Sequence, residues 1–204
     1  MVSDQLIGRL ARAMSAPAPS VALVDVPQEL IEAEPSLQGG FGDAAFQPGV
    51  CHGSLLLTEV SGDREGFLHT AVAENRMRFA KLAVLYGWLQ ADDHQFLYEN
   101  QPPHLVWSHD HGHFFPGGQN WTEETLNASH SAAIPDQKVV SSCALMDTEV
   151  HVALREIRDL STPEQVIAEV ISAIPTDWPF SPAERIAMAR FLEARRLALV
   201  SLIP

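Results

Sequence analysis

The spacing of apolar residues predicts a helix at the start of the chain. Ser3 is a candidate N-cap, and prolines at positions 17 and 19 end the segment. Its apolar residues recur every three or four positions, which places them on one face of the helix: Leu6, Ile7, Leu10 and Met14. We expect this face to pack against a core.

Shorter apolar runs in the first third of the chain predict β-strands. Residues 21–26 form a run that is typical of a buried strand, and residues 54–60 are a second candidate. Between them, residues 27–34 predict one or two helical turns, and the glycine-rich stretch 38–42 predicts a loop. The first third is therefore expected to mix helix and strand.

Helical patterns dominate the rest of the sequence. Residues 71–90 are apolar on more than one face, so we expect this helix to lie at the centre of the core. Further helices are predicted over residues 123–131, with Thr122 at the cap, over 146–160, from Thr162-Pro163, and from Ser181-Pro182 to about residue 202. The whole pattern predicts an α+β fold that is mainly α.

Charge and cysteine content narrow the class of protein. The 204 residues include 26 acids against 13 lysines and arginines, a net charge of −13, and the two lysines are Lys81 and Lys138. Such a chain is a poor ligand for nucleic acid or an anionic membrane, but it suits cations, including Mg²⁺ carried by a nucleotide. Cys51 and Cys143 form no disulfide framework or thiolate zinc pattern. With no signal-peptide layout or membrane-length apolar run, we expect a cytoplasmic protein.

The candidate chemistry surrounds a predicted hairpin. Residues 96–98 and 105–107 flank the turn sequence Asn-Gln-Pro-Pro. Asp92-Asp93-His94-Gln95 precedes the first strand and Asp110 follows the second, so the hairpin brings these polar side chains to one end. Oxygens that face each other in this way suit Mg²⁺ bound to a nucleotide. The alternative is that the first two aspartates only end a helix and that Asp110 only caps a turn.

Histidines add a second candidate site. His109, His111 and His113 alternate, so on an extended segment they would present three imidazoles to one metal ion that serves hydrolysis. The alternative, which we favour, is that one or two of these rings form local hydrogen bonds that hold the Asp110 loop.

The order of these elements resembles the HipA-like kinase family. Residues 85–96 resemble its catalytic loop, and His109-Asp110-His111-Gly112-His113 resembles the metal-binding Asp-Phe-Gly segment of kinases in its Asp-His-Gly form. The likeness extends to the opening helix and strand and to the final helix. It implies a protein-kinase-like fold with an incomplete small lobe over residues 1–60, a helical large lobe over 61–204 and a short hairpin at the cleft.

The resemblance also implies roles for individual residues. Asp110 and Gln95 would ligate Mg²⁺, and with His111 and Gly112 they would form the segment that binds ATP. Asp93, or Asp92 in its place, would orient or deprotonate the acceptor hydroxyl. The implied reaction is transfer of a phosphoryl group from ATP to a serine or threonine of a protein substrate.

The front of the chain departs from the family pattern and supports a second hypothesis. Asp4 stands roughly where kinases carry the acid that pairs with a lysine, but no lysine and no glycine-rich strand pair precede it. We therefore also consider a catalytically inactive kinase-like module that binds a regulatory protein, as in a toxin–antitoxin pair, or that forms a homo-oligomer.

Overall fold

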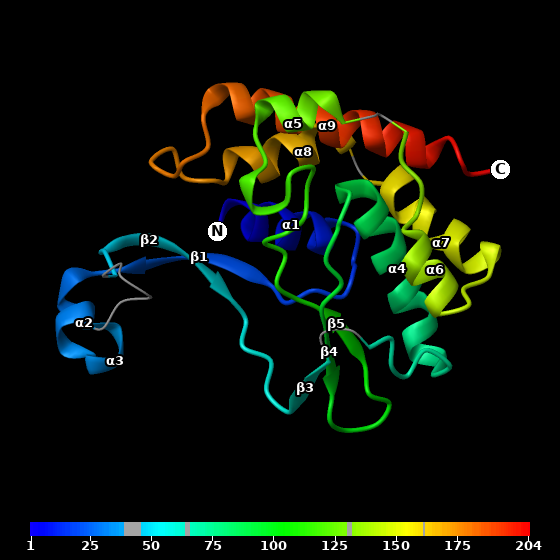
Figure 1. Cartoon of the computed structure of the whole chain (residues 1–204), viewed down its shortest axis with the longest axis horizontal. Coiled ribbons are helices and arrows are strands. Elements are labelled where there is room, and N and C mark those ends of the chain that lie inside the picture. Colours follow the sequence, from blue (N-terminus) through cyan, green and yellow to red (C-terminus); the bar gives the residue numbers. More distant parts are fainter. Residues whose placement is uncertain (39–45, 64–65, 130–131, 161) are drawn as a thin grey trace.

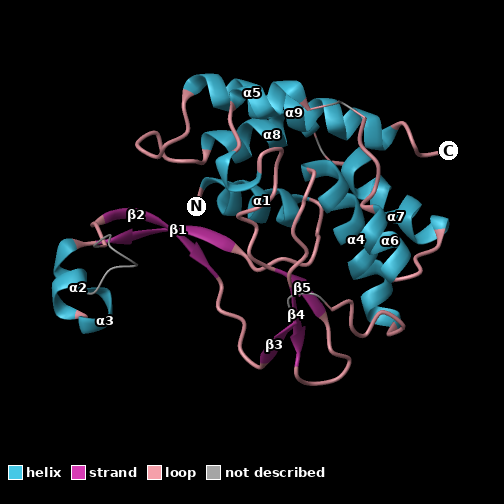
Figure 2. Ribbon diagram, viewed as in Figure 1, coloured by secondary structure: helices cyan, strands magenta, loops and turns pink. Residues whose placement is uncertain are grey.

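The computed structural model describes residues 1–38, 46–63, 66–129, 132–160 and 162–204, and the fold is α+β and mainly helical (Figures 1 and 2). The helices are α1 (Val2–Ala13), α2 (Gln28–Ala33), α3 (Pro35–Gln38), α4 (Ala73–Leu89), α5 (Glu123–Ala128), α6 (Gln137–Ser142), α7 (Asp147–Arg158), α8 (Pro163–Ser172) and α9 (Pro182–Val200), with a short 3-10 helix η1 (Gly118–Asn120). The strands are β1 (Val21–Val26), β2 (Gly49–Ser54), β3 (Val60–Asp63), β4 (Phe96–Glu99) and β5 (Val106–Ser108).

Helix α4 lies at the centre of the core, as its apolar pattern predicted. Its residues 79–89 are almost all buried, and α6, α7 and α9 pack around it. The apolar face of α1 is buried as well, and α1 packs against α8 and β1. The first helix therefore belongs to the same core as the later helices, and the predicted boundary at residue 60 stays a prediction.

The strands form two separate antiparallel sheets. β4 and β5 make the predicted hairpin, with Phe96 opposite Ser108, and β3 adds to the other edge of β4. β1 and β2 pair only with each other in the described part of the chain. The predicted strand over residues 54–60 is wrong: β2 ends at Ser54, β3 begins at Val60, and the residues between them connect the two sheets.

Strand β1 forms where the sequence predicted a strand, but its predicted burial is wrong. Its four central residues are exposed because the β1–β2 ribbon projects from the helical body (Figure 1). Only its start approaches a helix, where Val21 packs against Gly8 so closely that a methyl group on the glycine would clash. The run of apolar residues therefore does not mark a core strand here.

Helix ends show which capping predictions hold. The side chains of Thr122 and Ser181 cap α5 and α9 as predicted. The predicted cap at Ser3 is wrong, because this residue lies inside α1 and its hydroxyl accepts a hydrogen bond from the indole of Trp121. The stretch predicted as a loop at Gly39–Gly42 lies outside the described residues. No helix in the described part of the chain is long and apolar enough to cross a membrane.

Candidate functional site

The hairpin brings together the two polar segments that the sequence placed at its ends. Beyond the last paired residues of β4 and β5, the backbone N–H of His109 donates to the carbonyl of Gln95, at 3.2 Å. Asp110 is the next residue, so it lies beside the segment of Asp93 and Gln95. The predicted juxtaposition at one end of the hairpin is present.

Asp93 and Gln95 are joined directly. The side-chain amide of Gln95 donates to Oδ2 of Asp93 at 2.6 Å, and both residues are half-buried. This bond uses the amide nitrogen and leaves the carbonyl oxygen Oε1 of Gln95 available as a ligand. Asp92 is exposed and makes no hydrogen bond or ion pair with the described residues.

Asp110 has a left-handed backbone conformation, which aspartate adopts more readily than most other residues. Its φ is 54°, in the left-handed region that residues with a side chain rarely adopt. Its side chain is exposed, and Oδ1 would lie 3.7 Å from a methyl group placed on Gly112. Eight other non-glycine residues in the described part of the chain also have positive φ, so this conformation marks a tight turn and does not by itself mark a ligand site.

A buried chain of hydrogen bonds anchors this loop to the core. The hydroxyls of Tyr86 and Ser108 are 2.6 Å apart, and the Ser108 hydroxyl is 2.9 Å from Nε2 of His111. Burial lowers the pKa of His111 to about 4, so its ring is neutral at pH 7. Burial likewise raises the pKa of the Tyr86 phenol. The side chain of His111 therefore supports the loop from inside.

A second pair, partly buried, involves His94, the residue after Asp93. Nε2 of His94 is 3.1 Å from Oδ2 of Asp136, but the ring N–H is not directed at the oxygen, and neither ring nitrogen has a hydrogen-bond partner in the described structure. Burial acts to raise the pKa of Asp136, but the His94 ring and the backbone N–H of Val139 outweigh it and leave that pKa below its ordinary value.

The hypothesis that three histidines share a metal is wrong. His111 is buried and bonded to Ser108, whereas His113 is exposed and its Nε2 lies 2.8 Å from the amide of Gln119. The segment turns at Gly112 instead of running extended, so the rings do not alternate on one face. Within the described ranges, no group of three or more His, Cys, Asp or Glu side chains is arranged to hold a metal ion.

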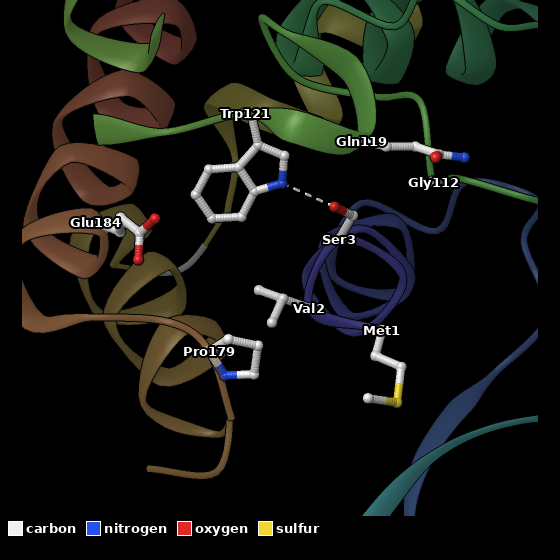
Figure 3. A pocket seen from close by; sticks show the side chains of 8 residues that line it. All are labelled: Met1, Val2, Ser3, Gly112, Gln119, Trp121, Pro179 and Glu184. Atoms are coloured by element: carbon white, nitrogen blue, oxygen red, sulfur yellow. Dashed lines mark hydrogen bonds between the residues drawn. The ribbon is translucent and has the colours of Figure 1, made fainter. Parts of the chain in front are cut away.

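A pocket of about 410 Å³ reaches the same loop from the side of α1 (Figure 3). Gly112 and Gln119 form one wall, and the Trp121 indole, bonded to Ser3 at 2.9 Å, closes the back. The other lining residues come from the start of α1 and from the segment that begins α9: Met1, Val2, Pro179 and Glu184. Its volume is in the range of small-molecule sites.

The lysines lie away from the site. Asp4 on α1 is 3.0 Å from the amino group of Met1, where the resemblance leads us to expect a lysine partner. Lys81 pairs with Glu156 of α7 at 3.1 Å, and Lys138 is exposed on α6. No lysine of the described chain therefore neutralises charge beside Asp110.

The residues that the resemblance assigns to Mg²⁺ are compatible with it in ligand type. The side-chain oxygens of Asp110 and Gln95, the two residues expected to hold the ion, are hard donors of the kind that Mg²⁺ prefers. Sequence reasoning missed Ser108, Tyr86 and Asp136, which support the site from the interior and carry no motif. A comparison with protein-family models, curated proteins and solved structures found no match to this chain.

Proposed function

We propose that this chain is a HipA-like protein-kinase-family protein that binds Mg²⁺ and ATP and transfers a phosphoryl group to a protein serine or threonine in the cytoplasm. The observation that carries the proposal is the bond between Gln95 and Asp93 beside the left-handed Asp110. It links a candidate metal ligand to a candidate base at one end of a hairpin.

Each side chain has a role in the proposed reaction. Asp110 and Oε1 of Gln95 would hold Mg²⁺, which supplies charge neutralisation at the phosphates. The carboxylate of Asp93, oriented by the Gln95 amide, would accept the hydroxyl proton of the acceptor. The bond from the γ-phosphorus to its bridging oxygen breaks, the bond to the acceptor oxygen forms, and ADP leaves with the electron pair. The exposed position of Asp92 supports Asp93 over it as the base.

A catalytically inactive binding module is the second candidate. The pairing of Lys81 with Glu156 of α7 favours it, because that lysine is then not free to stabilise charge in phosphoryl transfer. Such a module would keep the metal site and bind a protein partner without transferring phosphate.

Thermal unfolding in the presence of ATP and Mg²⁺ tests the metal site. We expect ATP and Mg²⁺ together to raise the melting temperature, since a ligand at one hundred times its Kd stabilises by about 2.7 kcal/mol. Asp110→Asn removes a ligand charge and should abolish the shift. Asp25→Asn, which changes an exposed carboxylate on β1, should keep it.

Three outcomes distinguish the hypotheses. A shift that Asp110→Asn leaves intact would show that the assigned ligand is wrong. A shift that needs Asp110, without phosphorylation of any serine or threonine protein, would favour the inactive module. No shift with ATP and Mg²⁺ at millimolar concentration would rule out both metal-dependent versions.

A further inference from the structure

The β1–β2 ribbon has one open edge. The backbone N–H of Leu55 donates to the carbonyl of Ser20 at 2.8 Å, which makes these residues a hydrogen-bonded pair. Hydrogen-bonded pairs alternate along an antiparallel ladder. With Val21 opposite Ser54, the backbone groups of residues 21, 23 and 25 must then point away from β2. No other described strand pairs with this edge.

The two edges of the ribbon are not equivalent. On β2, the carbonyl of Val50 accepts a hydrogen bond at 3.0 Å from the indole of Trp178, which ties that edge to the segment before α9. The outward backbone groups of β1 lie on the opposite edge of the ribbon, and Figure 1 shows the ribbon projecting from the helical body. An incoming strand therefore has access to β1 and not to the whole of β2.

Apolar side chains are exposed along the same ribbon. Leu23 is 37% exposed, Val24 is 44% exposed and Val50 is 36% exposed, so both faces of the ribbon carry apolar groups. An exposed strand with apolar side chains and unpaired backbone groups is a template for another strand. Natural proteins usually protect such edges with lysine or proline, and β1 carries neither.

The charge of the projecting part of the ribbon defines the chemistry of a partner, whereas Arg9 and Arg12 of α1 lie beside its start at Val21. Residues 14–63 contain seven acids and no lysine or arginine: Asp25, Glu29, Glu32, Glu34, Asp43, Glu59 and Asp63. Five of these acids are exposed on β1, on α2 and its C-cap, and in the connection before β3: Asp25, Glu29, Glu32, Glu34 and Glu59. A second copy of this chain would bring the same acids together at a net charge of −13, whereas a basic segment would complement them.

We propose that the outer edge of β1 binds an extended segment of a partner protein that carries lysine or arginine, by addition of a third strand. Main-chain hydrogen bonds to residues 21, 23 and 25 supply the affinity, and alternate side chains of the incoming strand meet Leu23 and the acids. The proposal does not rest on the metal site, because the ribbon edge uses none of its residues.

A defined peptide tests this edge in the full chain. The probe is a fluorescein-labelled octapeptide of alternating lysine and valine, and its binding is followed by fluorescence anisotropy. We expect saturable binding, and we expect an octapeptide of alternating glutamate and valine to bind at least tenfold more weakly. EDTA and Asp110→Asn should leave the affinity unchanged, which separates this result from the test of the metal site.

Two substitutions in β1 separate the contribution of backbone hydrogen bonds to peptide binding from the contribution of charge. Leu23→Pro removes an outward N–H that β2 does not use, so the ribbon keeps its own ladder while the peptide binds at least tenfold more weakly. Asp25→Lys should weaken binding at least fivefold while the backbone stays intact. Amide exchange of β2 in each variant checks that the ribbon still forms.

Opposite results would overturn the proposal. They are equal binding of the glutamate and lysine peptides, or unchanged binding by Leu23→Pro with an intact ribbon. A concentration-dependent dimer in sedimentation that Leu23→Pro abolishes would show that a second copy covers the edge instead.

Discussion

Ser108 joins the core to the candidate site through a single hydroxyl. It is fully buried and lies within hydrogen-bond distance of both the Tyr86 phenol and the His111 ring. A buried polar group that loses its partner costs about 1–3 kcal/mol, so each member of this chain holds the other two in place. The position of Asp110 therefore depends on residues that no ligand touches.

The buried ring of His111 predicts a loss of stability in mild acid. Its pKa is 6.5 in an unfolded chain and about 4 in the folded protein, because burial disfavours the charged ring. Between these pH values the unfolded chain binds more protons, so the free energy of unfolding falls as the pH is lowered from 6.5 to 4. The contribution is fully present above pH 6.5 and is on the order of 1–3 kcal/mol.

Denaturant unfolding at several pH values, in EDTA, measures this effect. His111→Gln keeps a polar contact with Ser108 but cannot take up a proton. Its unfolding free energy should therefore fall less steeply between pH 6.5 and 4 than that of the unchanged chain. Equal slopes for the two proteins would contradict the assignment.

At the residue scale, sequence reasoning found the carboxylates but not their supports. Asp93, Gln95 and Asp110 stand at the ends of a hairpin whose turn residues are visible in the sequence. Ser108 is one serine among many, and its burial depends on how α4 packs against β5. Asp136 caps a helix, α6, that the apolar pattern did not predict.

At the element scale, α4 depends on a glycine that allows a close approach. A methyl group on Gly87 would overlap the backbone carbonyl of Ile134, which crosses the helix before α6. Helix propensity alone would favour alanine here by about 1 kcal/mol. Because a backbone atom cannot turn away as a side chain can, we expect Gly87→Ala to destabilise the protein by about 2–3 kcal/mol instead.

Urea unfolding shows whether Gly87→Ala raises or lowers the free energy of unfolding. Gly62→Ala is the matched control, since its new methyl group would lie 3.4 Å from the side chain of Leu97. The control should change the free energy of unfolding by no more than about 0.5 kcal/mol. Stabilisation by Gly87→Ala would show that the 134–135 segment does not pack against α4 as described.

Burial of the elements was harder to predict than their type. The apolar run 21–26 gives a strand by composition, yet burial depends on what covers it, and β1 lies on a projecting ribbon. Residues 55–57 are three leucines, but after Leu55, whose N–H still bonds the carbonyl of Ser20, the chain crosses from one sheet to the other. Neither arrangement can be predicted from the local sequence.

At the scale of the whole molecule, one hydrogen bond ties the ribbon to the C-terminal third of the chain. Trp178 is buried and donates to Val50, whereas Gln5 of α1 holds the ribbon at Ala22 and His52; a two-stranded ribbon with few such anchors is marginal in water. Trp178→Phe removes the donor and keeps an aromatic ring. We expect the amides of residues 21–26 and 49–54 to exchange about fivefold faster, as the loss of about 1 kcal/mol implies.

Hydrogen–deuterium exchange, read by peptide, checks this prediction. Trp107→Phe removes a different indole bond, to Glu99 in the β4–β5 hairpin, and should leave the ribbon unchanged. Faster exchange throughout the molecule in Trp178→Phe would indicate global destabilisation instead of release of the ribbon.

Several of these contacts join residues that are far apart in the sequence, and this has a consequence for biosynthesis. Trp178 meets Val50 across 128 positions, Trp121 meets Ser3 across 118, and Arg195 of α9 binds the carbonyl of Trp88 across 107. During translation, α1, the ribbon and α4 leave the ribosome before the partners that cover them. The apolar surface of α4 then stays without its packing partners until α9 emerges, so this nascent chain is a natural client for chaperones and folds only after most of it has been made.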